Sequence, residues 1–182
     1  MSVRILVLLA TFVTLTYGVS AGHNTSAISG FPKIRVGFNV ESSPEPHLPL
    51  VRYGKVQYYF GAILGDTVEQ VDLFCRYHGM KLVSIQTKEE TANLIAGLRN
   101  YLEPSEKVKF WTSGKKYSNN NQWRWESTGL PTHYTNWAKG EPNNSGGNEA
   151  CIEVFFNGAA KTLEWNDNNC DVVNYFICES RD

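Results

Sequence analysis

The chain has 182 residues, with 17 lysines and arginines against 18 aspartates and glutamates, and 42% of its residues are hydrophobic. This length suits one domain with a short appendage, and an aromatic content of 13% excludes intrinsic disorder. A net charge of −1 provides no basic surface for nucleic acid or for an anionic membrane, so we expect no nucleic-acid partner.

Residues 1–21 have the pattern of a secretory signal peptide. Arg4 supplies the positive charge, residues 5–17 are apolar apart from threonines, and Val19-Ser20-Ala21 provides small residues for cleavage. An uncleaved anchor is the less favoured alternative, because a membrane span needs about 20 predominantly apolar residues. We therefore expect a secreted, extracellular protein without membrane insertion.

Residues 22–52 are predicted to form an N-terminal extension and a proline-rich linker. Apolar and polar residues alternate over 34–40, which predicts a half-buried strand, and the prolines of 42–49 interrupt regular pairing. No heptad repeat is present to build a coiled-coil stalk. The sequence Asn24-Thr25-Ser26 makes Asn24 a predicted N-glycosylation site.

Residues 53–182 are predicted to form one mixed α+β domain with two helices. The first helix begins at Asp66 or Thr67 and ends at Gly79, and the second covers about 88–101. Thr87 and Glu90 form a capping box, in which each side chain accepts from the other's backbone N–H. Short strands are predicted over residues 56–60, 82–85, 108–112, 123–125, 152–156 and 175–178.

The domain contains four cysteines, and residues 127–148 show little periodicity. A secreted chain with an even number of cysteines is expected to form two disulfides, and four cysteines allow three pairings. A zinc site is excluded, because no C-x-x-C spacing exists and the histidines are scattered. An irregular segment as long as 127–148 is usually functional or a misassigned element.

Two predicted loop segments concentrate oxygen ligands. They are Glu141-Pro142-Asn143 with Glu149, and Trp165-Asn166-Asp167. Calcium takes 6–8 oxygen ligands, including carboxylates and carbonyls, so five such side chains would form an incomplete shell. Either segment alone is better explained as a turn. Together, each beside a cysteine, they favour a shared site.

These segments, with others in the same order, resemble the C-type lectin-like domain over about residues 53–179. The further matching segments are Cys75 to Ile85, Phe110-Trp111-Thr112-Ser113-Gly114, Trp137, Glu149-Ala150-Cys151, Cys170, and Tyr175 to Glu179. The resemblance implies that fold, with short antiparallel strands and a long calcium-binding loop. It also implies the disulfides Cys75–Cys178 and Cys151–Cys170.

The resemblance further implies one Ca²⁺ ion that coordinates two vicinal sugar hydroxyls. Its metal-binding and sugar-binding residues would be Glu141, Asn143, Glu149, Asn166 and Asp167. The asparagine amides would donate to the hydroxyls and the glutamates would accept from them. The peptide bond before Pro142 would be cis.

The motif also implies a sugar class and a single metal ion. In the family, the order Glu-Pro-Asn goes with mannose, fucose or N-acetylglucosamine, and Gln-Pro-Asp with galactose, although neighbouring loop residues can override this preference. Members with a second calcium usually carry aspartate where this chain has Asn144, and residues 114–121 contain no carboxylate. Asn143-Asn144-Ser145 is a sequon, but a glycan would remove a ligand, so we expect Asn143 to stay unmodified.

The resulting prediction is a calcium-dependent lectin for terminal sugars of glycoproteins or microbial surface glycans, as in innate immunity. The alternative is a lectin-like domain that binds a protein ligand without sugar. A glycosidase is disfavoured, because Glu141 and Glu149 as calcium ligands would be ionised and could not act as an acid. Self-association would raise the avidity of a one-site lectin. Trp111, Trp123 and Trp125 are predicted to be buried rather than to stack on sugar.

Overall fold

The computed structural model describes residues 48–117 and 122–181. The predicted signal peptide, Asn24 and the predicted strand 34–40 lie outside the described residues. The chain divides into two units, 1–43 and 44–182, and the second contains the described residues. Within these residues, no helix has both the length and the apolar character that crossing a membrane requires.

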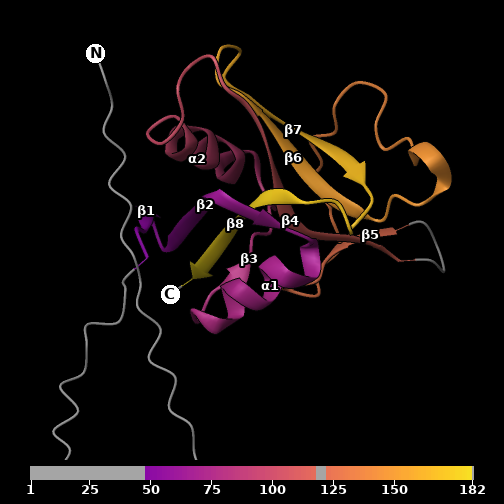
Figure 1. Cartoon of the computed structure of the whole chain (residues 1–182), viewed down its shortest axis with the longest axis horizontal. Helices are drawn as coiled ribbons and strands as arrows, with labels where there is room; N and C mark the ends of the chain where they lie inside the picture. The colour runs from indigo at the N-terminus through magenta and orange to yellow at the C-terminus, as the bar shows by residue number, and fades with distance from the viewer. Residues whose placement is uncertain (1–47, 118–121, 182) are drawn as a thin grey trace, which may run out of the picture. The chain divides into compact units, whose positions relative to one another are not determined.

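A mixed sheet forms the centre of the domain (Figure 1). Its strands follow the order β1 (Val51–Tyr53), β2 (Val56–Asp66), β8 (Asn174–Arg181), β4 (Lys107–Tyr117), β6 (Cys151–Asn157) and β7 (Thr162–Asn168). The short strands β3 (Lys81–Leu82) and β5 (Gln122–Trp125) pair with β8 and β4. All pairs are antiparallel except β4 with β8. The predicted α+β class is confirmed.

The helices α1 (Val68–Tyr77) and α2 (Lys88–Leu98) lie on opposite sides of the sheet (Figure 1). Helix α1 ends two residues before Gly79, whose φ of +69° is readily adopted only by glycine. At the start of α2, Thr87 Oγ1 accepts from Glu90 N at 3.1 Å, as predicted. Glu90 Oε2 instead accepts from Gln86 N at 2.6 Å, so the capping box is not reciprocal.

Two apolar clusters hold these layers together. The first packs Leu94 and Leu98 of α2 against strand residues that include Trp125 and Trp165. The second packs α1 against Trp111 and the strand β8. Burial removes this apolar surface from water, which is the main force that favours folding. The predicted burial of tryptophans is confirmed for Trp111 and Trp125, which are inaccessible, whereas Trp123 is half-buried.

Both predicted disulfides are present. Cys75 of α1 is bonded to Cys178 of β8, and Cys151 at the start of β6 is bonded to Cys170. The first bond closes 103 residues of chain and the second closes 19. The short bond joins the ends of the β6–β7 hairpin, on which Asp167 lies.

The prediction that Trp165-Asn166-Asp167 forms a loop is wrong. These residues belong to β7, in which buried residues alternate with half-buried ones, and Asn166 lies opposite Glu153 of β6. Asp167 occupies a position in this alternation where strands usually carry an apolar residue, and its burial requires hydrogen-bond partners. The strand β7 therefore carries two of the five predicted calcium ligands.

Candidate functional site

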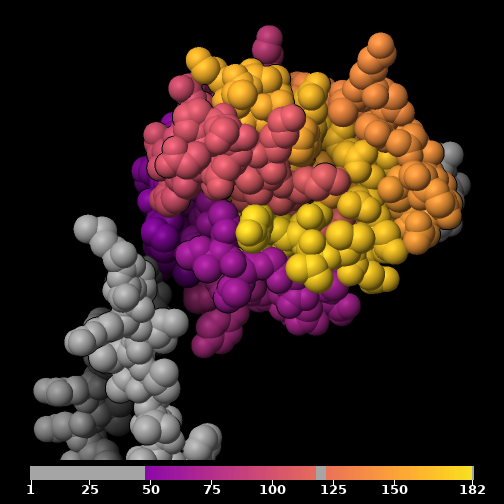
Figure 2. All heavy atoms as spheres, turned by 45° about the horizontal axis from the view of Figure 1, so that its top comes forward, coloured from indigo at the N-terminus to yellow at the C-terminus, as the bar shows by residue number. Residues whose placement is uncertain are grey.

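The long irregular segment between β5 and β6 carries the other three predicted ligands, Glu141, Asn143 and Glu149. Within it, the Glu141–Pro142 peptide bond is cis, as the resemblance implies, and Asn144 has a φ of +48°. A single 3-10 turn, η1 (Ser145–Gly147), is the one helical element of this segment. Figure 2 shows the orange atoms of the segment between β5 and β6 beside the yellow atoms of the C-terminal part of the chain.

Asp167 joins the two predicted segments directly. Its side chain is fully buried, and its two carboxylate oxygens accept hydrogen bonds from the backbone N–H groups of Asn143 and Asn144, each at 2.9 Å. Hydrogen bonds to a charged group are stronger than neutral ones, roughly 1.5–3 kcal/mol each. Asp167 thus fixes the loop backbone at the position of the Glu-Pro-Asn motif.

A second set of hydrogen bonds closes the loop on itself. Asn144 Oδ1 accepts from Glu149 N at 3.0 Å, and Glu149 Oε2 accepts from Ser145 N at 2.6 Å. The half-buried Glu149 carboxylate is therefore held at the same end of the domain as Asp167. The sequence marks Asn144 as a departure from the family pattern. In the structure, its side chain also holds the loop together through the hydrogen bond from Glu149 N.

The loop is also attached to β7 on the side that precedes the motif. Ala138 N donates to Trp165 O and Trp165 N donates to Asn136 O, both at 2.8 Å. The rings of Trp137 and Trp165 meet edge to face with centroids 5.5 Å apart. Since Trp165 directly precedes Asn166 and Asp167, its packing against Trp137 stabilises the part of β7 that carries these two predicted ligands.

One of the two carboxylate oxygens of Glu141 has no hydrogen-bond partner among the described residues. Its Oε2 atom is buried and accepts no hydrogen bond in the described part of the chain. Burial and the neighbouring Asp167 carboxylate raise the pKa of Glu141 above its ordinary value, and Glu149 raises it further. A cation between these groups would provide the missing partner and favour the ionised form.

Asn166 is the one predicted ligand whose contacts lead away from the loop. Its Nδ2 donates to Glu153 Oε1 at 2.9 Å across the β6–β7 pair. One of its two amide hydrogens is therefore engaged already, which the sequence did not predict. Burial would raise the pKa of Glu153, but hydrogen bonds from Lys109, Asn168 and Asn166 outweigh it and hold that pKa below its ordinary value.

The donor set fits a hard cation better than a soft one. Carboxylate and amide oxygens are the ligands that calcium prefers, and no sulfur or imidazole is among them. In residues 48–117 and 122–181, no three acidic, histidine or cysteine side chains form a metal cluster by themselves. The amide oxygens of Asn143 and Asn166 would thus be needed alongside the carboxylates.

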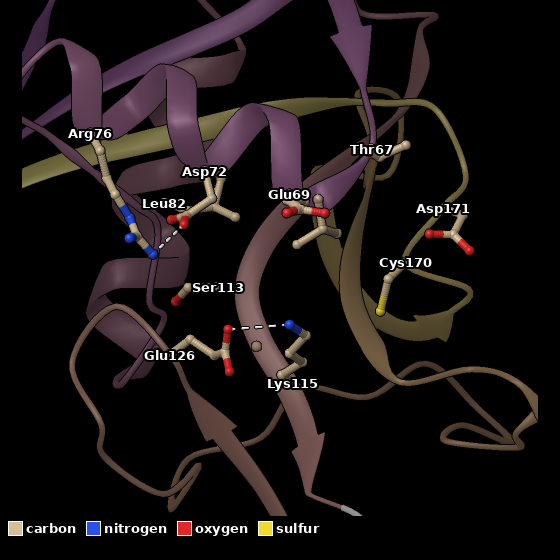
Figure 3. Close-up of a pocket in the computed structure, with 12 residues that line it drawn as sticks. Thr67, Glu69, Asp72, Arg76, Leu82, Ser113, Lys115, Glu126, Cys170 and Asp171 are labelled. Atoms are coloured by element: carbon tan, nitrogen blue, oxygen red, sulfur yellow. Dashed lines mark hydrogen bonds and ion pairs between the residues drawn. The ribbon is translucent and has the colours of Figure 1, made fainter.

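A separate cavity of about 450 Å³ holds none of these predicted ligands (Figure 3). It lies between α1 and the strand β4, and two ion pairs line it, Asp72 with Arg76 and Lys115 with Glu126. These ion pairs largely cancel the charge of their members, but Glu69 and Asp171 also line the cavity and belong to neither pair. The cavity therefore has more acidic than basic side chains, and none of them belongs to the predicted calcium ligands.

Comparison with known proteins identifies relatives across this region. A family model described as the lectin C-type domain matches residues 65–180. A C-type lectin of Micrurus corallinus is 33% identical over 114 residues, covering 62% of this chain and 69% of the relative. A C-type lectin mannose-binding isoform of Oxyuranus scutellatus is 34% identical over 112 residues, covering 60% and 68%. The mouse scavenger receptor C-type lectin carbohydrate-recognition domain has a TM-score of 0.62 at 28% identity, covering 75% of this chain and 97% of that structure.

Proposed function

Because this chain belongs to the C-type lectin domain family, we propose that it is a secreted lectin whose sugar is held by one calcium ion. The ion's protein ligands would be Glu141, Asn143, Glu149, Asn166 and Asp167. Members of this family are non-enzymatic binding proteins, and the chain is not an enzyme.

The observation that carries this proposal is the contact of Asp167 with the Glu-Pro-Asn loop. Two segments 24 residues apart meet through the hydrogen bonds from Asn143 N and Asn144 N to one buried carboxylate. Turn-forming residues with no shared task would have no reason to bury a charge between them, because burial of a charge is costly. The unpartnered Oε2 of Glu141 supports the same site.

Calcium, when bound, would supply an electrophilic centre that coordinates two neighbouring sugar hydroxyls. The side chains around it would then recognise the same hydroxyls, with Glu141 and Glu149 as acceptors and Asn143 as a donor. Asn166 would donate through its second amide hydrogen, since the first is engaged by Glu153. These four side chains would thus contact both metal and sugar, which explains why sugar binding should need the metal.

The order Glu141-Pro142-Asn143 favours mannose- or fucose-type sugars over galactose. A relative that is named as a mannose-binding isoform supports this class. The partners would then be terminal sugars of glycoproteins or of microbial surfaces. Extracellular calcium modules bind the ion at roughly 10⁻⁴–10⁻³ M, so the site would be occupied outside the cell.

A glycan array tests the proposal. In about 2 mM calcium, which is above the range of roughly 10⁻⁴–10⁻³ M in which extracellular modules bind the ion, we expect binding to mannose- or fucose-terminated glycans. EDTA should abolish it and added calcium should restore it. Binding to galactosides alone would contradict the proposed sugar class, and binding that survives EDTA would contradict the role of calcium. If calcium binds but no glycan does, the protein-ligand alternative would replace the proposal.

A further inference from the structure

The buried carboxylate of Glu153 receives four hydrogen bonds from three other strands. Lys109 Nζ of β4 and Asn166 Nδ2 of β7 donate to Oε1, at 2.6 and 2.9 Å. Asn168 Nδ2 of β7 and Asn174 Nδ2 of β8 donate to Oε2, at 2.9 and 2.7 Å. The Glu153 side chain has no exposed surface. It therefore joins β4, β6, β7 and β8 at one point.

This arrangement leaves the carboxylate no capacity for a ligand. An ionised carboxylate has about four acceptor sites, and four donors already occupy those of Glu153. A protonated carboxyl group would need an acceptor, and each of the four contacting groups is a donor. Glu153 thus acts on its neighbours and has no direct contact with metal or sugar.

An acceptor-only partner determines which way an asparagine amide faces. Since Glu153 can only accept, Asn166 must present Nδ2 to it, and Oδ1 lies on the other side of the amide group. Asn168 shows the same orientation, with Nδ2 on Glu153 while its Oδ1 accepts from Asn169 N at 2.8 Å. The Oδ1 atom of Asn166, by contrast, accepts from no donor within the described ranges.

We propose that Glu153 is a positioning residue of the calcium site, which holds the Asn166 amide so that Oδ1 is free to bind the metal. The proposal rests on the proposed function, because Asn166 is a ligand only if the site holds calcium. Groups that orient metal ligands typically contribute about 10- to 100-fold to metal affinity. The role of Glu153 should be of this size.

The test is Glu153→Gln, which preserves size but puts an amide in place of the carboxylate. Asn168 cannot turn its amide without losing the hydrogen bond from Asn169 N, so the glutamine oxygen should face Asn168 and its NH₂ should face Asn166, while the half-exposed Lys109 moves into solvent. The Asn166 amide must then turn its oxygen toward the glutamine NH₂ and away from the metal. Calorimetric titration of calcium should then show an affinity about 10- to 100-fold weaker than wild type. In the metal-free protein, the Asn166 side-chain NH₂ signals in a ¹H–¹⁵N spectrum should also shift.

Two further variants separate positioning from simple stability. Asn174→Ala deletes a hydrogen bond to the other Glu153 oxygen and touches no predicted ligand. It should lower the melting temperature. Calcium affinity should stay within about threefold of wild type, which is a far smaller loss than removal of an orienting group causes. In Glu153→Gln with Asn168→Asp, the new aspartate accepts from the glutamine NH₂, and the glutamine oxygen returns to Asn166. Calcium affinity should recover in this double variant.

The outcomes distinguish this inference from the proposed function. If wild type binds no calcium, the proposed function fails and the inference with it. If wild type binds calcium and Glu153→Gln binds it equally well, only the inference is overturned. It is also overturned if Asn174→Ala weakens calcium binding as much as Glu153→Gln does at a similar melting temperature.

Discussion

Asp167→Asn is expected to abolish measurable calcium binding. The substitution removes a negative charge from the proposed metal shell and gives the side chain only one acceptor oxygen. That oxygen cannot serve both the Asn143 and the Asn144 N–H groups in their present places, so the loop loses one of its charge-assisted hydrogen bonds. A loss of roughly 1.5–3 kcal/mol from the hydrogen bonds alone corresponds to about 10- to 100-fold in affinity.

Isothermal titration of calcium into the purified variant measures this effect. The matched control is Asp171→Asn, which removes the same charge from an exposed residue near the end of β7 and should leave affinity close to wild type. Trp165 lies two positions before Asp167 and is buried, so its fluorescence provides a second readout. Wild-type affinity in Asp167→Asn would contradict the ligand assignment.

Loss of the Cys75–Cys178 disulfide is expected to lower the stability of the protein more than loss of Cys151–Cys170. For calcium affinity we expect the reverse order. On the chain-entropy model, removal of the 103-residue loop at Cys75–Cys178 costs about 4–5 kcal/mol, and removal of the 19-residue loop at Cys151–Cys170 costs roughly 3 kcal/mol. The short disulfide, however, joins the ends of the hairpin that carries Asn166 and Asp167. Loss of this disulfide should therefore weaken calcium binding more than loss of Cys75–Cys178.

Paired Cys→Ala variants, unfolded in guanidinium chloride with and without calcium, measure both quantities. Calcium raises the free energy of unfolding by RT ln(1 + [Ca²⁺]/Kd), so tighter binding to the folded state gives a larger gain. We expect the Cys75–Cys178 variant to be the less stable one in EDTA and the Cys151–Cys170 variant to gain less from calcium. Equal gains from calcium in the two variants would show that the hairpin disulfide does not support the site.

The strand β7 shows where the sequence was insufficient. Its buried positions are Leu163, Trp165 and Asp167, an alternation that is clear only if an aspartate is counted as a core residue. Asparagine and aspartate are depleted in strands, so the sequence of this segment predicts a loop. The hydrogen bonds that make burial of Asp167 acceptable come from residues 23 and 24 positions earlier, which no local pattern reveals.

The helices were predictable for the opposite reason. Both helices carry local signals, namely a periodic apolar face, Thr87 with Glu90, and Gly79. The pairing of the cysteines was not readable from spacing and came from the family resemblance. Glu153 carried one weak signal, since it interrupts an apolar strand, but its partners lie on three other strands and no sequence pattern connects them.

The most direct test of the central claim is a calorimetric titration of calcium with and without saturating methyl mannoside. We predict one calcium per chain, with the sugar tightening calcium binding by the same factor by which calcium tightens sugar binding, because the two share ligands and binding is reciprocal. Calcium binding that is unaffected by mannoside, or no calcium binding at all in the folded, disulfide-bonded protein, would contradict the account.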